Sequence, residues 1–297
     1  WNKSIPDNYS AQTQLHFDST AIKGFLEKNS NFKPYSADIY KFYRNRKFAY
    51  AWFDSRGIIE QASNLHSRIQ HLGDEGLSGK VPYANKLDTL MQTANSKADV
   101  TIELMLTGNY FAFSKIAWQG GVDDKEMKQM EWFLPRKKLD SQKYLEEIIS
   151  QPSENLISKD PAYRQYDLLK LSLKKYRELA ANDKWEIIKA DKKSYKPGDS
   201  STVIQKIRSR LVLLGDLKAD NASKVYDEEL QTAAKQFQFR HGLTDDGVLG
   251  PGFFNALNVS PQQRINQLLV NIERRRWVPE KVTGSHLIVN MPSFKLY

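Results

Sequence analysis

The chain has 297 residues, of which 40% are hydrophobic and 11% aromatic, so it can build substantial cores and is not a disordered polymer. It contains no cysteine, which excludes disulfides, zinc–thiolate sites and a thiol nucleophile within these residues. The net charge of +9 favours polyanions such as nucleic acid, anionic membranes or acidic wall polymers, although an ordinary basic, solvated surface gives the same charge.

The length predicts about two domains. No stretch of about 18 apolar residues occurs, so we expect no membrane span. The first residue is Trp1 rather than Met, and we therefore expect a mature or trimmed chain.

Residues 1–190 are predicted to form a mainly helical domain. An aromatic run over 42–53 ends at the turn signal 54–57, and a helix is expected to follow and to stop at Gly73. Apolar residues recur in that helix every three or four positions, at Ile58, Ala62, Leu65, Ile69 and Leu72.

Residues 99–118 are apolar almost all round, which is typical of a helix buried at the centre of a bundle. Gly120 and Gly121 are expected to end it. A further helix is predicted over about 141–149, before Pro152.

Asp160-Pro161 is a favourable helix start, and the residues after it form one stripe. The stripe consists of Tyr163, Tyr166, Leu169, Leu173, Tyr176 and Leu179. Its aromatics could stack on sugars, but helical spacing favours core packing.

The polar segment 189–199, with Pro-Gly near its end, is predicted to be a linker between domains. After it, residues 196–258 are predicted to form a small three-helix domain. The first helix should start at Ser201 or Thr202 and close at Gly215, the second should run from Asp227 to Gly242, and the third should cover about 253–257.

The chain changes character after Pro261. A helix is expected over 262–276, and residues 287–297 begin with a β-branched, apolar strand signal. A lone strand has no partner, so we interpret 259–297 as a linker helix and the first strand of a β-rich domain that is missing here.

One specific motif lies in the three-helix segment. Its run is Phe237-Gln238-Phe239-Arg240-His241-Gly242-Leu243-Thr244-Asp245-Asp246-Gly247-Val248-Leu249-Gly250-Pro251. With Ile207, Arg210-Leu211, Leu214-Gly215, Tyr226-Asp227 and Ala233 upstream, it resembles the peptidoglycan-binding domain of bacterial wall hydrolases and transpeptidases. Most of the motif serves the fold, through an inward Phe237, a helix stop at Gly242 and a tight bend at Asp246-Gly247.

Phe253 departs from that pattern, because the family usually has a helix-capping Thr after Gly-Pro-Gly. Either the third helix starts elsewhere, which we favour, or an aromatic side chain stands at the edge of a groove.

The flanking segments narrow the resemblance. They include Asn258 to Ile265, Asn271 to Pro279 and Ile288 to Phe294, and upstream Phe53-Asp54, Asp74 to Leu77, Leu104 to Thr107, Trp132 to Arg136, Tyr176 to Leu179 and Trp185. These segments are similar to the helical scaffold and the entry of the catalytic domain in large Gram-negative L,D-transpeptidases with a YkuD-type catalytic domain. The resemblance implies a mainly α fold, a periplasmic or cell-envelope location and the cross-linking of wall stem peptides through a cysteine acyl-enzyme.

The residues that would perform this cysteine chemistry do not occur in this sequence. The family's Ser-His-Gly-Cys-type motif is absent, and Ser285-His286 is a partial match that is better explained as an exposed turn. We therefore name no catalytic residue and expect this chain, truncated before the catalytic motif, to be inactive as a transpeptidase.

Candidate ligand-binding residues are Arg240 and His241 at the end of the second helix, and Asp246 in the turn after it. For Arg240 we favour the simpler interpretation of a solvated helix-end charge that the helix dipole stabilises. The five scattered histidines predict no metal site, and no cofactor is expected. Peptidoglycan is the expected partner of a monomer; the alternatives are a stand-alone, non-enzymatic wall-binding protein and, from charge alone, a nucleic-acid binder, for which no reading motif is found.

Overall fold

The computed structural model describes residues 15–94, 97–122, 124–129, 140–150, 164–182, 185–277, 289–290 and 295–296. These residues are mainly helical, which confirms the predicted fold class. The chain divides into two compact units, Trp1–Lys170 with Leu269–Tyr297, and Leu171–Leu268. Helices α9 (Arg164–Asn182) and α13 (Pro261–Trp277) each contribute residues to both units. No helix among these residues is long and apolar enough to cross a membrane.

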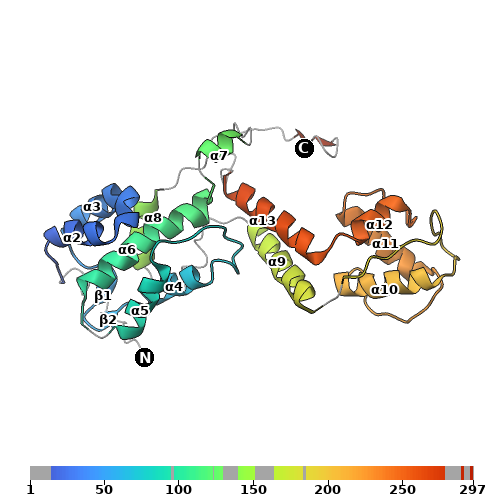
Figure 1. Cartoon of the computed structure of the whole chain (residues 1–297), viewed down its shortest axis with the longest axis horizontal. Helices are drawn as coiled ribbons and strands as arrows, with labels where there is room; N and C mark the ends of the chain where they lie inside the picture. Colours follow the sequence, from blue (N-terminus) through green and yellow to red (C-terminus); the bar gives the residue numbers. More distant parts are fainter. Residues whose placement is uncertain are drawn as a thin grey trace, which may run out of the picture. The chain divides into compact units, whose positions relative to one another are not determined.

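The first unit is a set of helices around one central helix (Figure 1). Its elements are α2 (Thr20–Lys28), the 3-10 helix η1 (Ser30–Tyr35), α3 (Ser36–Asn45), β1 (Phe53–Asp54), β2 (Gly57–Ile58), α4 (Glu60–Gln70), α5 (Ala84–Thr93), α6 (Val100–Ser114), the π-helical turn η2 (Lys115–Gln119), α7 (Asp124–Gln129) and α8 (Ser141–Ile149). Strands β1 and β2 form a short antiparallel hairpin in which Phe53 lies opposite Ile58.

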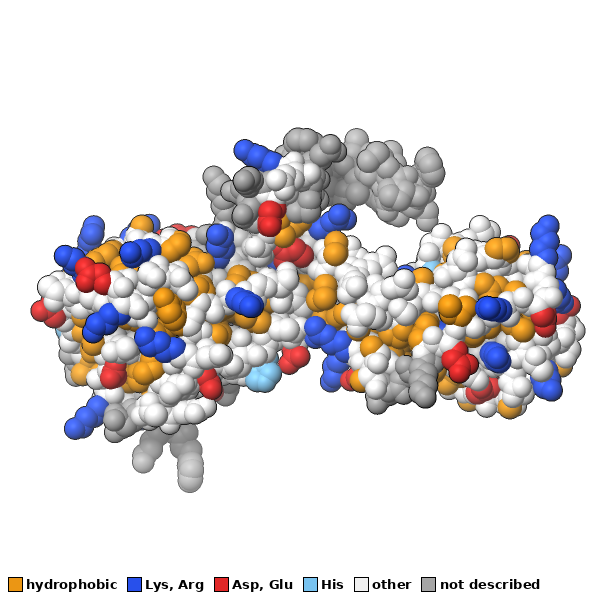
Figure 2. Space-filling view, viewed as in Figure 1, with side chains coloured by type: hydrophobic (Ala, Val, Ile, Leu, Met, Phe, Trp, Pro, Cys, Tyr) orange, Lys and Arg blue, Asp and Glu red, His pale blue; other side chains and the backbone are white. Residues whose placement is uncertain are grey.

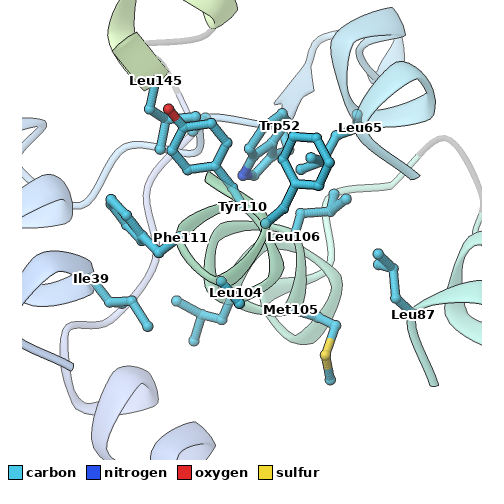
Figure 3. Packing of buried hydrophobic residues seen from close by; sticks show 14 of the residues in the cluster. Ile39, Trp52, Leu65, Leu87, Leu104, Met105, Leu106, Tyr110, Phe111 and Leu145 are labelled. Carbon is cyan, nitrogen blue, oxygen red and sulfur yellow. The ribbon is translucent and has the colours of Figure 1, made fainter. Parts of the chain in front are cut away.

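Helix α6 is the centre of this unit, as predicted. Every residue from Ile102 to Ser114 is buried, and Figure 3 shows side chains leaving α6 on several sides to meet residues of neighbouring elements. The Asp99 carboxylate caps the helix by accepting the amides of Thr101 and Ile102. At the other end, Gly120 has φ +90°, so a glycine ends this helical segment as expected.

A buried carboxylate on α6 connects the central helix to the segment before the hairpin. Glu103 has no exposed surface, and its Oε1 accepts the Tyr43 hydroxyl at 2.7 Å and the Ala51 amide at 2.7 Å. Its Oε2 accepts the Trp52 amide at 3.0 Å. Thr107, one turn along α6, accepts the Trp52 indole N–H at 2.9 Å. The polar groups of α6 are thereby used to place residues 51–52 in the core.

The end of α4 differs from the prediction. The helix expected over 58–72 is α4, but it ends at Gln70 with His71 as its C-cap, and Gly73 is not its stop. The positive φ that a glycine stop needs is found instead at Gly76, where φ is +66°. The predicted start at Asp160-Pro161 lies outside the described residues, as do Tyr163, Ser285 and His286.

The C-terminal strand prediction is wrong in one respect. Val289–Asn290 (β3) is a strand, but it is not alone, since it pairs antiparallel with Lys295–Leu296 (β4). The strand therefore finds its partner within the same C-terminal segment.

Helix α13 closes the first unit with a buried polar cluster. Oε1 of Glu273 accepts the Trp277 indole N–H at 3.1 Å and the Val122 amide at 3.2 Å. Arg276, which is 5% exposed, donates to Oε2 of Glu273 at 3.2 Å and to the Tyr166 hydroxyl at 2.8 Å. A Cβ at Gly120 would lie 2.5 Å from Oε1 of Glu273, so only glycine allows this approach.

The second unit contains the predicted three helices, α10 (Thr202–Leu214), α11 (Glu228–Arg240) and α12 (Pro251–Leu257). Ser201 and Asp227 cap the first two, as their positions predicted. Gly215, with φ +79°, ends α10. Their apolar faces form a core around Ile207, Leu211, Leu230, Phe237, Leu249 and Leu257.

The segment 189–199, which we predicted to be a linker, packs against this core. Tyr195 is fully buried, and its backbone forms a bridge with Leu249 through bonds of 3.2 and 3.0 Å. Just before the segment, Ile188 exchanges two hydrogen bonds with the Asn258 side chain, at 2.9 and 3.0 Å. The segment is therefore part of the second unit. Domain limits at 190 and 196 remain a prediction from the sequence.

Phe253 resolves the two alternatives for the third helix. The helix starts two residues earlier than expected, with Gly250 as N-cap and Pro251 in the first turn. Phe253 is 2% exposed, and its ring lies 5.0 Å from that of Phe237. It is a core residue and not an aromatic at the edge of a groove.

We expect Glu103→Ala to lower the free energy of unfolding of the first unit by roughly 3 kcal/mol. Three buried donors would lose their acceptor, and an unsatisfied buried group costs about 1–3 kcal/mol. Urea unfolding measures the loss, and amide hydrogen exchange at Ala51 and Trp52 localises it. Glu27→Ala, on the exposed face of α2, is the matched control. Equal urea midpoints for the two variants would contradict the assignment.

The same carboxyl should make stability depend on pH. Burial raises the pKa of Glu103 to about 7 from its ordinary value of 4.5, despite hydrogen bonds that lower it. A raised pKa in the folded state means that this contribution is full below about 4.5 and is lost as pH rises through about 7. Between pH 5 and pH 8, the melting temperature of the wild type should fall further than that of Glu103→Gln, which cannot titrate. Parallel falls in the two proteins would refute the expectation.

Candidate wall-binding site

The site lies within the second unit, where α11 ends. Arg240 is the last residue of α11. It donates two hydrogen bonds to Asp216 in the turn after α10, from Nε at 2.7 Å and from Nη2 at 2.5 Å. The Asp216 side chain is 2% exposed and that of Arg240 35% exposed. Burial opposes the charge of Arg240, but the bonds and charge of Asp216 outweigh it and raise the pKa of the guanidinium. Arg240 is therefore not a freely solvated helix-end charge.

His241 is half-buried beside this ion pair. Its ring stacks on Phe237 with centroids 4.0 Å apart, and Nδ1 lies 2.9 Å from the Phe237 carbonyl oxygen. Burial, together with the charges of Arg240 and Arg264, lowers the pKa of His241 to about 4 from its ordinary value of 6.5. The imidazole is neutral at physiological pH, so it offers shape and a hydrogen-bonding nitrogen rather than charge.

Two further side chains belong to this cluster and were not predicted from the sequence. Tyr176, on α9, lies close enough to Arg240 to help raise the pKa of its guanidinium. Arg264, near the start of α13, lies close enough for the charges of Tyr176 and Arg240 to act on its pKa, and its own charge acts on the pKa of His241. Both residues lie outside the motif at 237–251, so the folded unit is needed to bring them to it. We call Arg240, His241, Arg264, Tyr176 and Asp216 the α11-end cluster.

Asp246 occupies a different position from the other two candidates. Its Oδ1 accepts the Val248 amide at 2.8 Å and the Gln238 side-chain amide at 3.0 Å. These bonds, that of Val248 foremost, lower the pKa of Asp246 and keep it ionised. Gln238 is 3% exposed and also accepts the Gly247 amide at 2.9 Å. Asp246 therefore shapes the turn after α11, and these hydrogen bonds go to α11 and to that turn rather than to the α11-end cluster.

Metal and polyanion chemistry find little support elsewhere. In the described parts of the chain, no three His, Asp or Glu side chains are grouped so that they could hold a metal ion. On the face seen in Figure 2, Lys and Arg side chains are spread out and interrupted by acidic ones, rather than gathered in one basic patch. On this face, the distribution is that of an ordinary basic surface.

Comparison with protein families agrees with this division of the chain. Residues 37–173 match the family described as "Scaffold domain". Residues 200–257, which include α10, α11 and α12, match the family described as "Putative peptidoglycan binding domain". The chain carries a scaffold domain and a peptidoglycan-binding domain. Comparison with curated proteins finds no match.

We expect Arg240→Ala to destabilise the second unit by about 2 kcal/mol, because it leaves the buried Asp216 carboxylate without its guanidinium. In a double-mutant cycle with Asp216→Ala, the double variant should lose less than the sum of the single losses. Thermal or urea unfolding measures all four proteins. Lys206→Ala, an exposed cation on α10, is the control for loss of charge. Additive losses would show that the pair contributes nothing.

Proposed function

We propose that the chain binds peptidoglycan through its second unit and that the first unit serves as a scaffold. The match of residues 200–257 to the peptidoglycan-binding family is the observation that carries this proposal. The fold supports it, because the motif residues that define the family occupy structural positions here. Phe237 is in the core, Gln238 holds the turn and Gly247 supplies its positive φ of +75°.

The finer proposal is that the chain belongs to an L,D-transpeptidase that cross-links stem peptides in the periplasm. The scaffold match over residues 37–173 and the order of the two domains support it. In such a protein, the wall-binding unit would hold the substrate polymer near a catalytic domain that supplies the cysteine. Arg240 and His241 remain the proposed contacts, whereas Asp246 is proposed to act through the shape of its turn.

A second candidate is a stand-alone wall-binding protein without enzymatic activity. It needs only the binding step, and that step requires no cysteine, which these 297 residues lack. The two candidates share the same binding step, so a binding experiment with the 297-residue chain tests both.

We expect the chain to sediment with purified peptidoglycan sacculi at physiological salt and to remain in solution with cellulose. Cellulose is a β-linked polysaccharide without stem peptides, so retention by both polymers would indicate unspecific adsorption. A duplex DNA binding assay at the same salt controls for the net charge of +9.

Retention on sacculi no greater than on cellulose would refute the proposed function. DNA binding of similar strength would place the affinity in the net charge rather than in the second unit.

A further inference from the structure

Arg264 is the arginine of the α11-end cluster that forms no ion pair with a carboxylate among the described residues. It is half-buried, and its guanidinium donates to the Ala256 carbonyl oxygen at 3.2 Å and to the Gln267 side-chain oxygen at 3.0 Å. Both acceptors are neutral. Within the described residues, no ion pair involves Arg264, whereas Arg240 has its own carboxylate.

The surroundings make this leftover charge unfavourable. Burial lowers the pKa of Arg264, and the neighbouring charge of Arg240 lowers it too, while Tyr176 opposes both. The carboxylate of the cluster, Asp216, is held by both of its oxygens on Arg240. His241 is neutral at physiological pH and adds no compensating charge. The cluster therefore holds two guanidinium groups against one carboxylate and retains one net positive charge.

We propose that Arg264 binds a free peptide carboxylate, with the Tyr176 hydroxyl and the exposed edge of Arg240 beside it. A monoanion would cancel the one net charge, and the planar guanidinium can donate two parallel hydrogen bonds to the two oxygens of a carboxylate. The partial burial of the site strengthens such a pair relative to one in open water.

This inference rests on the proposed function and specifies it further. Stem peptides of the wall end in a carboxylate, while glycan hydroxyls carry no charge. The proposal therefore assigns the peptide terminus, rather than the sugar, to the α11-end cluster. Its position after α11 also explains why the motif alone does not reveal the contact, since Arg264 lies outside residues 200–257.

The test uses the full chain and a synthetic stem pentapeptide ending in D-alanine, prepared as the free acid and as the C-terminal amide. In calorimetric titration, the wild type should bind the acid roughly tenfold more tightly than the amide, because the amide cannot form the charge-assisted pair. Arg264→Gln should bind both peptides equally, at the affinity of the amide. Arg264→Lys, which keeps the charge but not the two parallel bonds, should fall between them.

Lys206→Gln removes the same charge from an exposed position on α10 and should behave like the wild type. Each variant is also tested on sacculi and by circular dichroism, so that loss of folding is recognised. Equal binding of acid and amide by the wild type, or a preference for the acid that survives in Arg264→Gln, would overturn the assignment.

Inorganic phosphate supplies a further arm, because acidic wall polymers carry phosphate. Phosphate and acetate are each titrated as competitors of the peptide. A carboxylate site is supported if more phosphate than acetate is needed to displace the peptide. The assignment is overturned if less phosphate than acetate is needed. Failure of both peptides while sacculi are still bound rejects this inference but leaves the proposed function intact. Failure to bind sacculi at all rejects the proposed function itself.

Discussion

The burial of α6 on all sides imposes the main constraint on the first unit. A helix that meets protein on every face cannot leave a polar side chain to water, so each polar group on it needs an internal partner. Glu103 meets this requirement by accepting the Tyr43 hydroxyl and the amides of Ala51 and Trp52. The bonds also fix the backbone that leads into the β1–β2 hairpin. One carboxylate thus has its hydrogen bonds satisfied inside the core and also fixes where residues 51–52 enter it.

The second unit solves the same problem at the ends of its helices. Arg240 closes the end of α11 onto Asp216, and Gln238 satisfies the backbone of the following turn. Arg208 has no exposed side-chain surface and pairs with Asp227, which is also the N-cap of α11. A small domain with a limited apolar core gains much of its definition from such polar contacts.

The sequence predicted those features that depend on neighbouring residues. The caps Ser201 and Asp227, the limits of α8 and the all-round burial of α6 follow from patterns within a few positions. Gly73 was misjudged because α4 stops at Gln70 without needing a left-handed residue. The packing of segment 189–199 does not follow from its polar composition, because a single aromatic, Tyr195, anchors it in the core. The lone-strand interpretation failed because β4, a strand of two residues, pairs with β3 and is too short to leave a pattern in the sequence.

The candidate site shows the same boundary between local and long-range information. Arg240 and His241 could be named from the motif, but their partners could not. Asp216, Tyr176 and Arg264 are separated from Arg240 by 24 positions or more and share no spacing rule with it. Since the residues shared with the family mainly build the fold, they are poor guides to what a given member binds. Recognition is better sought at positions that the family pattern does not constrain and that the fold brings to the end of α11, where charge remains unpaired.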